Sequence, residues 1–295
     1  MFKRLSLAGW LSPLSCFLLA TLWPIATEAA KVHQPALADT SFSTLVSATP
    51  LKSAPTINEV PVGKPTMIEP TVQLDPLNSP HPVPWEWVMA THAEVLATTG
   101  SGVRYYRSPS LISSDGRYAA YSRIQMQVQP ELYRCRVSSV MFVENLQTGD
   151  LQTVVASSPL AEHPFSDSEE ANFPGAIAIL IPVSWNHTGD RILAREFEAM
   201  FSTSDMSDYA VIWDRNQNQS YTLSPARSFY THAVLLGWSQ TYPDEVLFKA
   251  GNLGDRTWPI WAVDLNGRTV AANQDKPLVF GQKVNNVWAG PQVHF

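Results

Sequence analysis

The first of three related segments, residues 113–122, reads Ser113-Ser114-Asp115-Gly116-Arg117-Tyr118-Ala119-Ala120-Tyr121-Ser122. It is a turn followed by a strand-like run, and a second run that ends in a turn follows at residues 140–149. The same order of turn, strand, strand and turn returns at residues 185–214 and 238–267. A supersecondary unit repeated along a chain is typical of architectures in which each copy forms one small sheet.

The rest of the body supports a β-sheet fold. Apolar residues alternate with period two and turn residues recur between the runs, as in short antiparallel strands. One helix is expected at residues 85–96, where apolar residues have helical spacing and Gly100 and Gly102 follow. The alternation predicts strands at residues 117–129, 137–146, 151–156, 177–184, 191–199, 209–214, 220–223, 233–238, 245–249, 259–265 and 268–272.

The three copies resemble the WD40-like (PD40) repeats of the β-propellers in TolB and in the non-catalytic domain of dipeptidyl peptidases. Blades of that family read roughly W-S-P-D-G-x-x-I-A-F, then I-Y-V-x-D-x-x-T-G. The resemblance covers residues 108–281 and implies an all-β, propeller-like body of three four-stranded blades. Only the first copy has Asp-Gly in its turn; the second has Thr-Gly-Asp and the third has Pro-Asp-Glu. The chain as a whole also resembles exported cyanobacterial proteins.

Closure of such a ring needs about four to eight blades, more than the repeats supply. We expect residues 85–107 and 282–295 to join as an incomplete fourth blade. An open stack of repeats and a ring closed by two chains are the alternatives.

The N-terminus has the layout of a secretory signal peptide. Lys3 and Arg4 precede an uncharged stretch at residues 5–25, and small residues follow it. An uncleaved membrane anchor is the alternative, because the stretch approaches the roughly 20 residues that cross a bilayer. Export to the periplasm, or to the thylakoid lumen of a cyanobacterium, is therefore expected. Cleavage is expected after Ala29, Ala30 or Ala38.

The predicted organisation has three parts: a signal peptide at 1–30, a disordered tether at 31–84 and the body at 85–295. The tether is rich in proline and poor in aromatic residues, so it lacks both amide donors and surface to bury. Of the 2 cysteines only Cys135 lies beyond the signal peptide, so no internal disulfide is expected and Cys135 is predicted to be buried. Lys plus Arg 20 against Asp plus Glu 26 gives a net charge of -6, which argues against a nucleic-acid partner.

Connection lengths differ between the two ends of the repeats. Tight turns lie at one end, here called the short-turn end, whereas residues 130–136, 157–175, 202–208, 224–232 and 251–258 all insert at the other, the long-loop end. Repeat proteins place binding surfaces where insertions gather, so we predict that the long-loop end contacts a protein or cell-envelope component. Its candidate contact residues are Tyr133, Arg134, Phe165, Phe173, Asp205, Asp208, Arg227, Phe229, Tyr230, Asp255, Arg256 and Trp258.

Catalytic motifs are absent from the sequence. It contains no Gly-x-Ser-x-Gly and no His-Glu-x-x-His, and its 7 histidines are dispersed, so no catalytic residue, metal site or cofactor is predicted. The leading hypothesis is an exported, non-catalytic binding module. One alternative is a carbohydrate-active or metal-assisted hydrolase with carboxylates in the propeller centre, and the other is an envelope spacer. The acids near strands are Glu196, Glu198, Asp214 and Asp264.

Overall fold

The computed structural model describes residues 75–161, 173–226, 230–285 and 289–293. All of them belong to the second of two units, residues 66–295, into which the chain divides. The predicted signal peptide, its cleavage sites and the tether up to residue 74 lie outside the described residues. Within the described ranges, no helix has the length and apolar character needed to cross a membrane.

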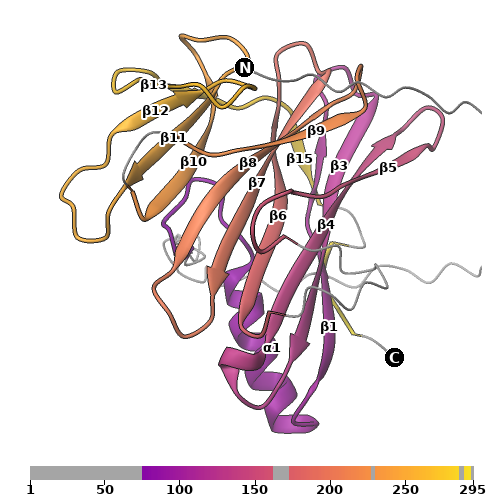
Figure 1. Cartoon of the computed structure of the whole chain (residues 1–295). Helices are drawn as coiled ribbons and strands as arrows, with labels where there is room; N and C mark the ends of the chain where they lie inside the picture. Colours follow the sequence, from indigo (N-terminus) through magenta and orange to yellow (C-terminus); the bar gives the residue numbers. More distant parts are fainter. Residues whose placement is uncertain (1–74, 162–172, 227–229, 286–288, 294–295) are drawn as a thin grey trace, which may run out of the picture. The chain divides into compact units, whose positions relative to one another are not determined.

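Each repeat forms an antiparallel meander of four strands (Figure 1). The first consists of β2 (Ser110–Ile112), β3 (Tyr118–Val128), β4 (Arg136–Asn145) and β5 (Leu151–Val154). The second consists of β6 (Ala176–Trp185), β7 (Arg191–Met200), β8 (Met206–Asp214) and β9 (Gln219–Leu223). The third consists of β10 (His232–Ser239), β11 (Val246–Gly251), β12 (Ile260–Val263) and β13 (Thr269–Ala271). The predicted β-rich body with one helix is confirmed.

The meanders combine into two sheets. The first two repeats share an 11-stranded sheet, because β4 and β6 pair in parallel at Val137 and Ile177. The third repeat belongs to a 5-stranded sheet in the order β13-β12-β11-β10-β14. Strand β6 is buried along its whole length, which explains its continuous run of apolar residues. Among the described strands the pairing does not close a barrel or a propeller ring.

Residues 277–284, here called the C-terminal segment, reach the first strand of every repeat. Its β14 (Pro277–Leu278) pairs with β10, and its β15 (Gln282–Val284) pairs with β2. Between them Phe280 bridges to Trp185 at the end of β6. The Trp185 amide donates to the Phe280 carbonyl at 3.0 Å, and the Phe280 amide donates to Ser184 Oγ at 2.7 Å. The segment therefore ties the three repeats together.

The chain ends also pair, but not as a separate fourth blade. Strand β1 (Gly102–Arg107) pairs with β16 (Gly290–Val293), as expected for residues 85–107 and 282–295. On its other side, β1 pairs with β3 over its whole length. The two ends consequently extend the sheet of the first repeat, which corrects the expectation of a fourth sheet.

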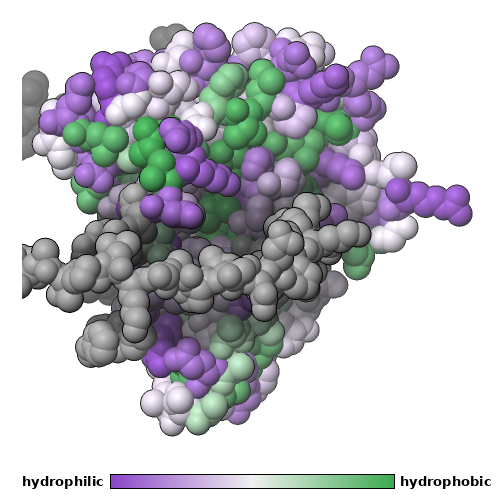
Figure 2. All heavy atoms as spheres, turned by 180° about the vertical axis from the view of Figure 1, so that it is seen from behind, coloured by the Kyte–Doolittle hydropathy of each residue, from purple (hydrophilic) through white to green (hydrophobic). Residues whose placement is uncertain are grey.

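Helix α1 (Trp85–Thr98) packs on the large sheet where the sequence predicted it. It buries Trp87, Val88, Thr91 and Val95, and its apolar residues join a core cluster with β3, β6 and β7. At the bottom of Figure 2, where Figure 1 draws α1, hydrophobic and hydrophilic residues are interspersed on the outer surface. The helix thus covers one face of the sheet with its buried side, while Met89 and Leu96 remain exposed.

The body begins earlier than predicted, since residues 75–84 belong to it rather than to a tether. Asp75 accepts hydrogen bonds from the amides of Leu77, Ser79 and Val83, and Val83 is fully buried. A disordered stretch has no such closed set of bonds. The proline-rich composition misled the prediction because the contacts that order this stretch are distant in sequence.

A second set of contacts holds this stretch to Arg195, a fully buried arginine on β7. Its Nη1 donates to Asp75 Oδ2 at 2.7 Å and to the His81 carbonyl at 2.7 Å, and its Nε donates to Asp208 Oδ1 at 2.8 Å. Asp208 Oδ2 in turn accepts the amide of Leu235 on β10. This network joins the start of the body to the second and third repeats.

Candidate functional site

The long connections gather at one end of the molecule, as the repeat pattern predicted. The Gly175 amide before β6 donates to the Cys135 carbonyl before β4 at 3.0 Å, and the Phe201 amide after β7 donates to the Gly175 carbonyl. His232 at the start of β10 contacts the Ser204 carbonyl at 3.0 Å. Figure 1 shows the β3–β4 and β7–β8 connections together at the lower edge of the large sheet.

Six of the predicted contact residues are exposed at this end. Tyr133 is 52% exposed and Phe173 56%, and the guanidinium of Arg134 lies 5.6 Å from the Tyr133 ring centre. All three are within two residues of the Gly175–Cys135 hydrogen bond, so they lie on adjacent chain segments. The other three exposed candidates are Asp205, Asp255 and Arg256.

Tyr230 and Trp258 are half-buried and folded back onto the protein. The Tyr230 hydroxyl donates to the Pro225 carbonyl, and the Trp258 indole donates to the Asn252 carbonyl beside the His232 ring. The polar group of each side chain is therefore hydrogen-bonded within its own loop. The remaining candidates Phe165, Arg227 and Phe229 lie outside the described residues.

Asp208 is not a surface residue, which corrects its assignment to the contact set. It is 0% exposed and is held by Arg195 and the Leu235 amide. Burial raises its pKa to about 6 although Arg195 opposes the shift. A loop acid and a buried acid look alike in sequence, because the burial of Asp208 depends on a neighbouring strand.

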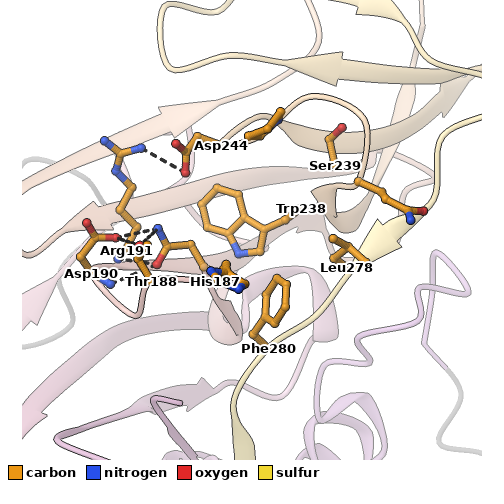
Figure 3. A pocket seen from close by; sticks show the side chains of 12 residues that line it. His187, Thr188, Asp190, Arg191, Trp238, Ser239, Asp244, Leu278 and Phe280 are labelled. Carbon is orange, nitrogen blue, oxygen red and sulfur yellow. Dashed lines mark hydrogen bonds and ion pairs between the residues drawn. The ribbon is translucent and has the colours of Figure 1, made fainter. Parts of the chain in front are cut away.

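A pocket lies at the opposite, short-turn end, where no site was predicted. It has a volume of about 590 Å³ and opens between the β6–β7 turn, the β10–β11 turn and the C-terminal segment. Figure 3 shows it from close by. The sequence of the tight turns did not predict this pocket, because the pocket forms between two repeats and not within an inserted loop. Its lining consists of Asn186, His187, Thr188, Asp190, Arg191, Trp238, Ser239, Gln240, Pro243, Asp244, Leu278 and Phe280.

The turn between the first and second strands is built alike in all three repeats, and two of these three turns frame the pocket. A polar side chain at the end of the first strand accepts amide hydrogen bonds from the turn. Asn186 Oδ1 accepts the amides of Asp190 and Arg191 in the second repeat. Ser113 and Ser239 take the same place in the other two repeats, which supports the repeat alignment.

Aromatic and aliphatic side chains form the floor of the pocket. Trp238 is only 3% exposed, and Leu278 and Phe280 lie beside it on the C-terminal segment. The His187 ring meets the Phe280 ring edge-on at 5.9 Å. The Trp238 indole nitrogen is buried and has no hydrogen-bond partner among the described residues. In Figure 3 this nitrogen is on the side of the ring that faces His187.

Charged groups form one wall of the pocket. The Arg191 side chain lies between two carboxylates, with Nε 2.8 Å from Asp214 Oδ2 and Nη1 3.4 Å from Asp244 Oδ1. Its pKa is raised, chiefly by the hydrogen bond to Asp214. Burial opposes ionisation of Asp190, but hydrogen bonds from Thr188 and Asn186 outweigh it and lower the pKa of that carboxyl. The wall therefore carries more negative than positive charge at neutral pH.

The two glutamates considered for catalysis are buried, although Glu198 also lines the pocket beside Asp205 and Tyr209. Glu196 and Glu198 lie on the same side of β7, as strand alternation predicts, and are 2% and 5% exposed. Burial raises the pKa of Glu196 well above its ordinary value, and its Oε2 has no partner within the described chain. Burial also raises the pKa of Glu198, whose Oε1 accepts the Leu160 amide at 2.8 Å.

Neither of the other two acids near strands is free for chemistry. Asp214 accepts a hydrogen bond from Arg191 Nε. Asp264 accepts hydrogen bonds from the amides of Asn266 and Arg268 in the turn that follows it. No three His, Cys, Asp or Glu side chains group as metal ligands in the part of the chain that the structure describes. Cys135 is a free, buried thiol, as predicted. No family model and no curated protein matches the chain.

Proposed function

We propose that the protein is an exported, non-catalytic binding module that holds a protein or cell-envelope component in the short-turn pocket. Its body is a propeller-like assembly of three blades whose first strands meet at the C-terminal segment. The observation that carries the proposal is the pocket itself, whose floor consists of Trp238, Leu278 and Phe280. A preformed, mostly apolar hollow with a few convergent polar groups is the usual form of a ligand site.

The position of the pocket supports a role in binding. Its walls come from two repeats and from the segment that ties all three, so its shape is set by the assembled body. The Trp238 indole nitrogen has almost no accessible surface, so Trp238 contributes to the floor through its ring and not as a donor to a ligand.

The long-loop end is the second candidate for contact with a partner. Tyr133, Arg134 and Phe173 are exposed there on adjacent segments. Aromatic residues and arginine dominate the energetics of protein interfaces. The pocket described at this end, beside Asp205 and Tyr209, is smaller and measures about 270 Å³.

The hydrolase alternative has less support. A carboxylate pair needs access to substrate, and of the two glutamates only Glu198 lines a described pocket, the one of about 270 Å³, whereas Glu196 is buried. The spacer alternative requires only a tether and gives no reason for the pocket.

Crystals soaked with a small-fragment library test the proposal. The library contains neutral, cationic and anionic compounds in equal numbers, so that the charge of the ligand is left open. We expect bound fragments to collect in the pocket, in contact with Trp238 and Phe280. Fragments that collect only around Tyr133 and Phe173 would show that the binding site is at the long-loop end instead. Fragments bound at neither place would refute the proposal.

A further inference from the structure

A second hollow, here called the proline pocket, lies where residues 75–84 meet the first repeat and β6. Its volume is about 190 Å³. One wall is extended chain: Val83 is fully buried in the core, and Pro82 and Pro84 on either side of it line the pocket. The other walls come from β1, β2, β6 and β15. The pocket therefore depends on residues 75–84 being part of the body.

The walls of the proline pocket are mostly apolar. A proline has no amide hydrogen and a fixed φ, so a wall of prolines offers no main-chain donor and keeps its shape. A preformed hollow of this kind needs little ordering when a ligand binds. Apolar groups of a ligand gain about 25 cal/mol per Å² that they bury there. The apolar lining consists of Pro82, Pro84, Pro109, Leu111, Ile181 and Pro182.

Lys283 is the charged residue of this lining, and no aspartate or glutamate lines the pocket among the described residues. The Lys283 ammonium has no ion pair or hydrogen bond with a described residue. Burial lowers the pKa of the nearby His81, and the charges of Lys283 and Arg195 lower it further. His81 is consequently neutral at pH 7 and does not add to the charge of the site.

Arg107 adds a second positive charge beside the pocket. It is 7% exposed, and its Nη1 donates to the carbonyl of the lining residue Ser108 at 3.3 Å. No carboxylate in the described part of the chain pairs with it. The nearest carboxylates, Asp75 and Asp208, share Arg195. Positive groups thus outnumber negative ones around the pocket, so an anion is attracted and a cation is repelled.

Size and polarity select the kind of anion. The pocket is smaller than the usual 300–1,000 Å³ or so of a drug-sized site, so its ligand is compact. A dianionic phosphate needs several donors, but the Nη groups of Arg107 already serve Ser108 and Ser110. The Ser108 hydroxyl donates to the Pro109 carbonyl. Tyr106 brings no competing negative charge, because burial raises the pKa of its hydroxyl.

We infer that the proline pocket binds a compact organic monocarboxylate with an apolar body. The carboxylate accepts from the Lys283 ammonium, and the apolar body lies against the prolines, Leu111 and Ile181. A free acid and the C-terminus of a chain that ends in an apolar residue share this chemistry. The site is separate from the short-turn pocket, so the inference goes beyond the proposed function and does not depend on it.

Nuclear magnetic resonance of backbone amides locates the binding in solution. The ¹H–¹⁵N signals of Leu111, Ile181 and Lys283 are followed while the purified protein is titrated with phenylacetate. The comparison probes are neutral phenylacetamide, dianionic phenyl phosphate and N-acetyl-L-leucine, which imitates a chain end. We expect phenylacetate to shift the three signals saturably. Phenylacetamide should bind about 2- to 5-fold more weakly, which corresponds to one partly exposed ion pair.

Two variants separate the charge of Lys283 from the shape of the pocket. K283M keeps most of the side-chain length and, because Lys283 is exposed, leaves the core unchanged. It should weaken phenylacetate about 2- to 5-fold and leave phenylacetamide unaffected. The matched control K276M removes an exposed lysine that does not line the pocket and should change neither titration.

Each outcome decides for or against the inference. Saturable shifts with phenylacetate or N-acetyl-L-leucine support it, and the tighter of the two identifies a free acid or a chain end as the source. Equal affinity for phenylacetate and phenylacetamide, or unchanged phenylacetate affinity in K283M, would refute the carboxylate contact. Tighter binding of phenyl phosphate would replace the monocarboxylate with a dianion. If no probe shifts these amides, the proline pocket is not a ligand site, whereas the fragment soak still decides the proposed function.

Discussion

Replacement of Arg195 by methionine should remove a large part of the stability of the fold. The side chain is fully buried, and its donors serve Asp75, Asp208 and the His81 carbonyl. Methionine fills much of the same volume but leaves two buried carboxylates without their cation. Removal of one partner from a buried ion pair costs about 3–5 kcal/mol.

The structure explains why the loss should fall within that range. Asp75 keeps the amide donors of Leu77, Ser79 and Val83, and Asp208 keeps the Leu235 amide. Both carboxylates stay hydrogen-bonded but lose their charge compensation. Since a domain is stable by about 5–15 kcal/mol in total, R195M should unfold at a much lower urea concentration.

The penalty should also depend on pH. The pKa of Asp208 is already raised to about 6 by burial, and loss of Arg195 raises it further. A carboxyl with a raised folded-state pKa destabilises the fold as pH rises from its unfolded value, 3.8, through the folded one. R195M should consequently lose less stability at pH 5 than at pH 8, because protonation removes the uncompensated charge.

Urea unfolding followed by tryptophan fluorescence at both pH values measures this. The midpoint should fall with an unchanged slope. R256M, which removes an exposed arginine from a loop, serves as the control and should change the free energy of unfolding by less than about 0.5 kcal/mol. A loss below about 1 kcal/mol for R195M, or a loss equal at pH 5 and pH 8, would contradict a buried charge network of this kind.

Three further predictions concern single side chains. E196Q should be more stable than the parent protein by a margin that grows as pH rises above 4.5, because burial keeps the pKa of Glu196 above that value. Melting temperatures of both proteins at pH 5 and pH 8 measure the margin, and equal margins at the two pH values would contradict the prediction. G281A should lower the free energy of unfolding in urea by about 1–3 kcal/mol, because φ at this position is +102 and a Cβ would approach the Ile112 carbonyl oxygen to 2.8 Å. The control G267A has open space around the new Cβ at φ +77 and should lower the free energy of unfolding by about 1 kcal/mol or less. Cys135 should react with a thiol reagent only after unfolding, because it is buried and burial raises the pKa of its thiol; rapid reaction of the native protein would refute this.

The strands of the repeats, except β2, were predictable because their signals are local, and β1 was missed as well. Alternating hydrophobicity and turn residues located β3 to β13, and helical spacing located α1. The short strands β14, β15 and β16 have no such signal, since each is extended only because another strand pairs with it. Propensity within two to four residues cannot predict a strand of that kind.

Contacts between distant residues limited the prediction of the site. Asp75 and Arg195 are separated by 120 positions, so the sequence gives no indication that proline-rich residues 75–84 join the body. Asp208 resembles any loop acid until Arg195 is placed beside it. The short-turn pocket depends on where Phe280 meets the end of β6, which no turn motif encodes.

Native-state hydrogen exchange at the amides of Trp185 and Phe280 tests most directly whether the C-terminal segment unites the repeats and forms the pocket floor. The Trp185 amide donates to the Phe280 carbonyl and the Phe280 amide donates to Ser184 Oγ, so these two hydrogen bonds fix the middle of the C-terminal segment. We predict that both amides exchange only with the free energy of global unfolding, as core strands do. Exchange of both through a local opening of much lower free energy, while the amides of β7 and the other amides of β6 remain protected, would contradict this role and leave the pocket without a fixed floor.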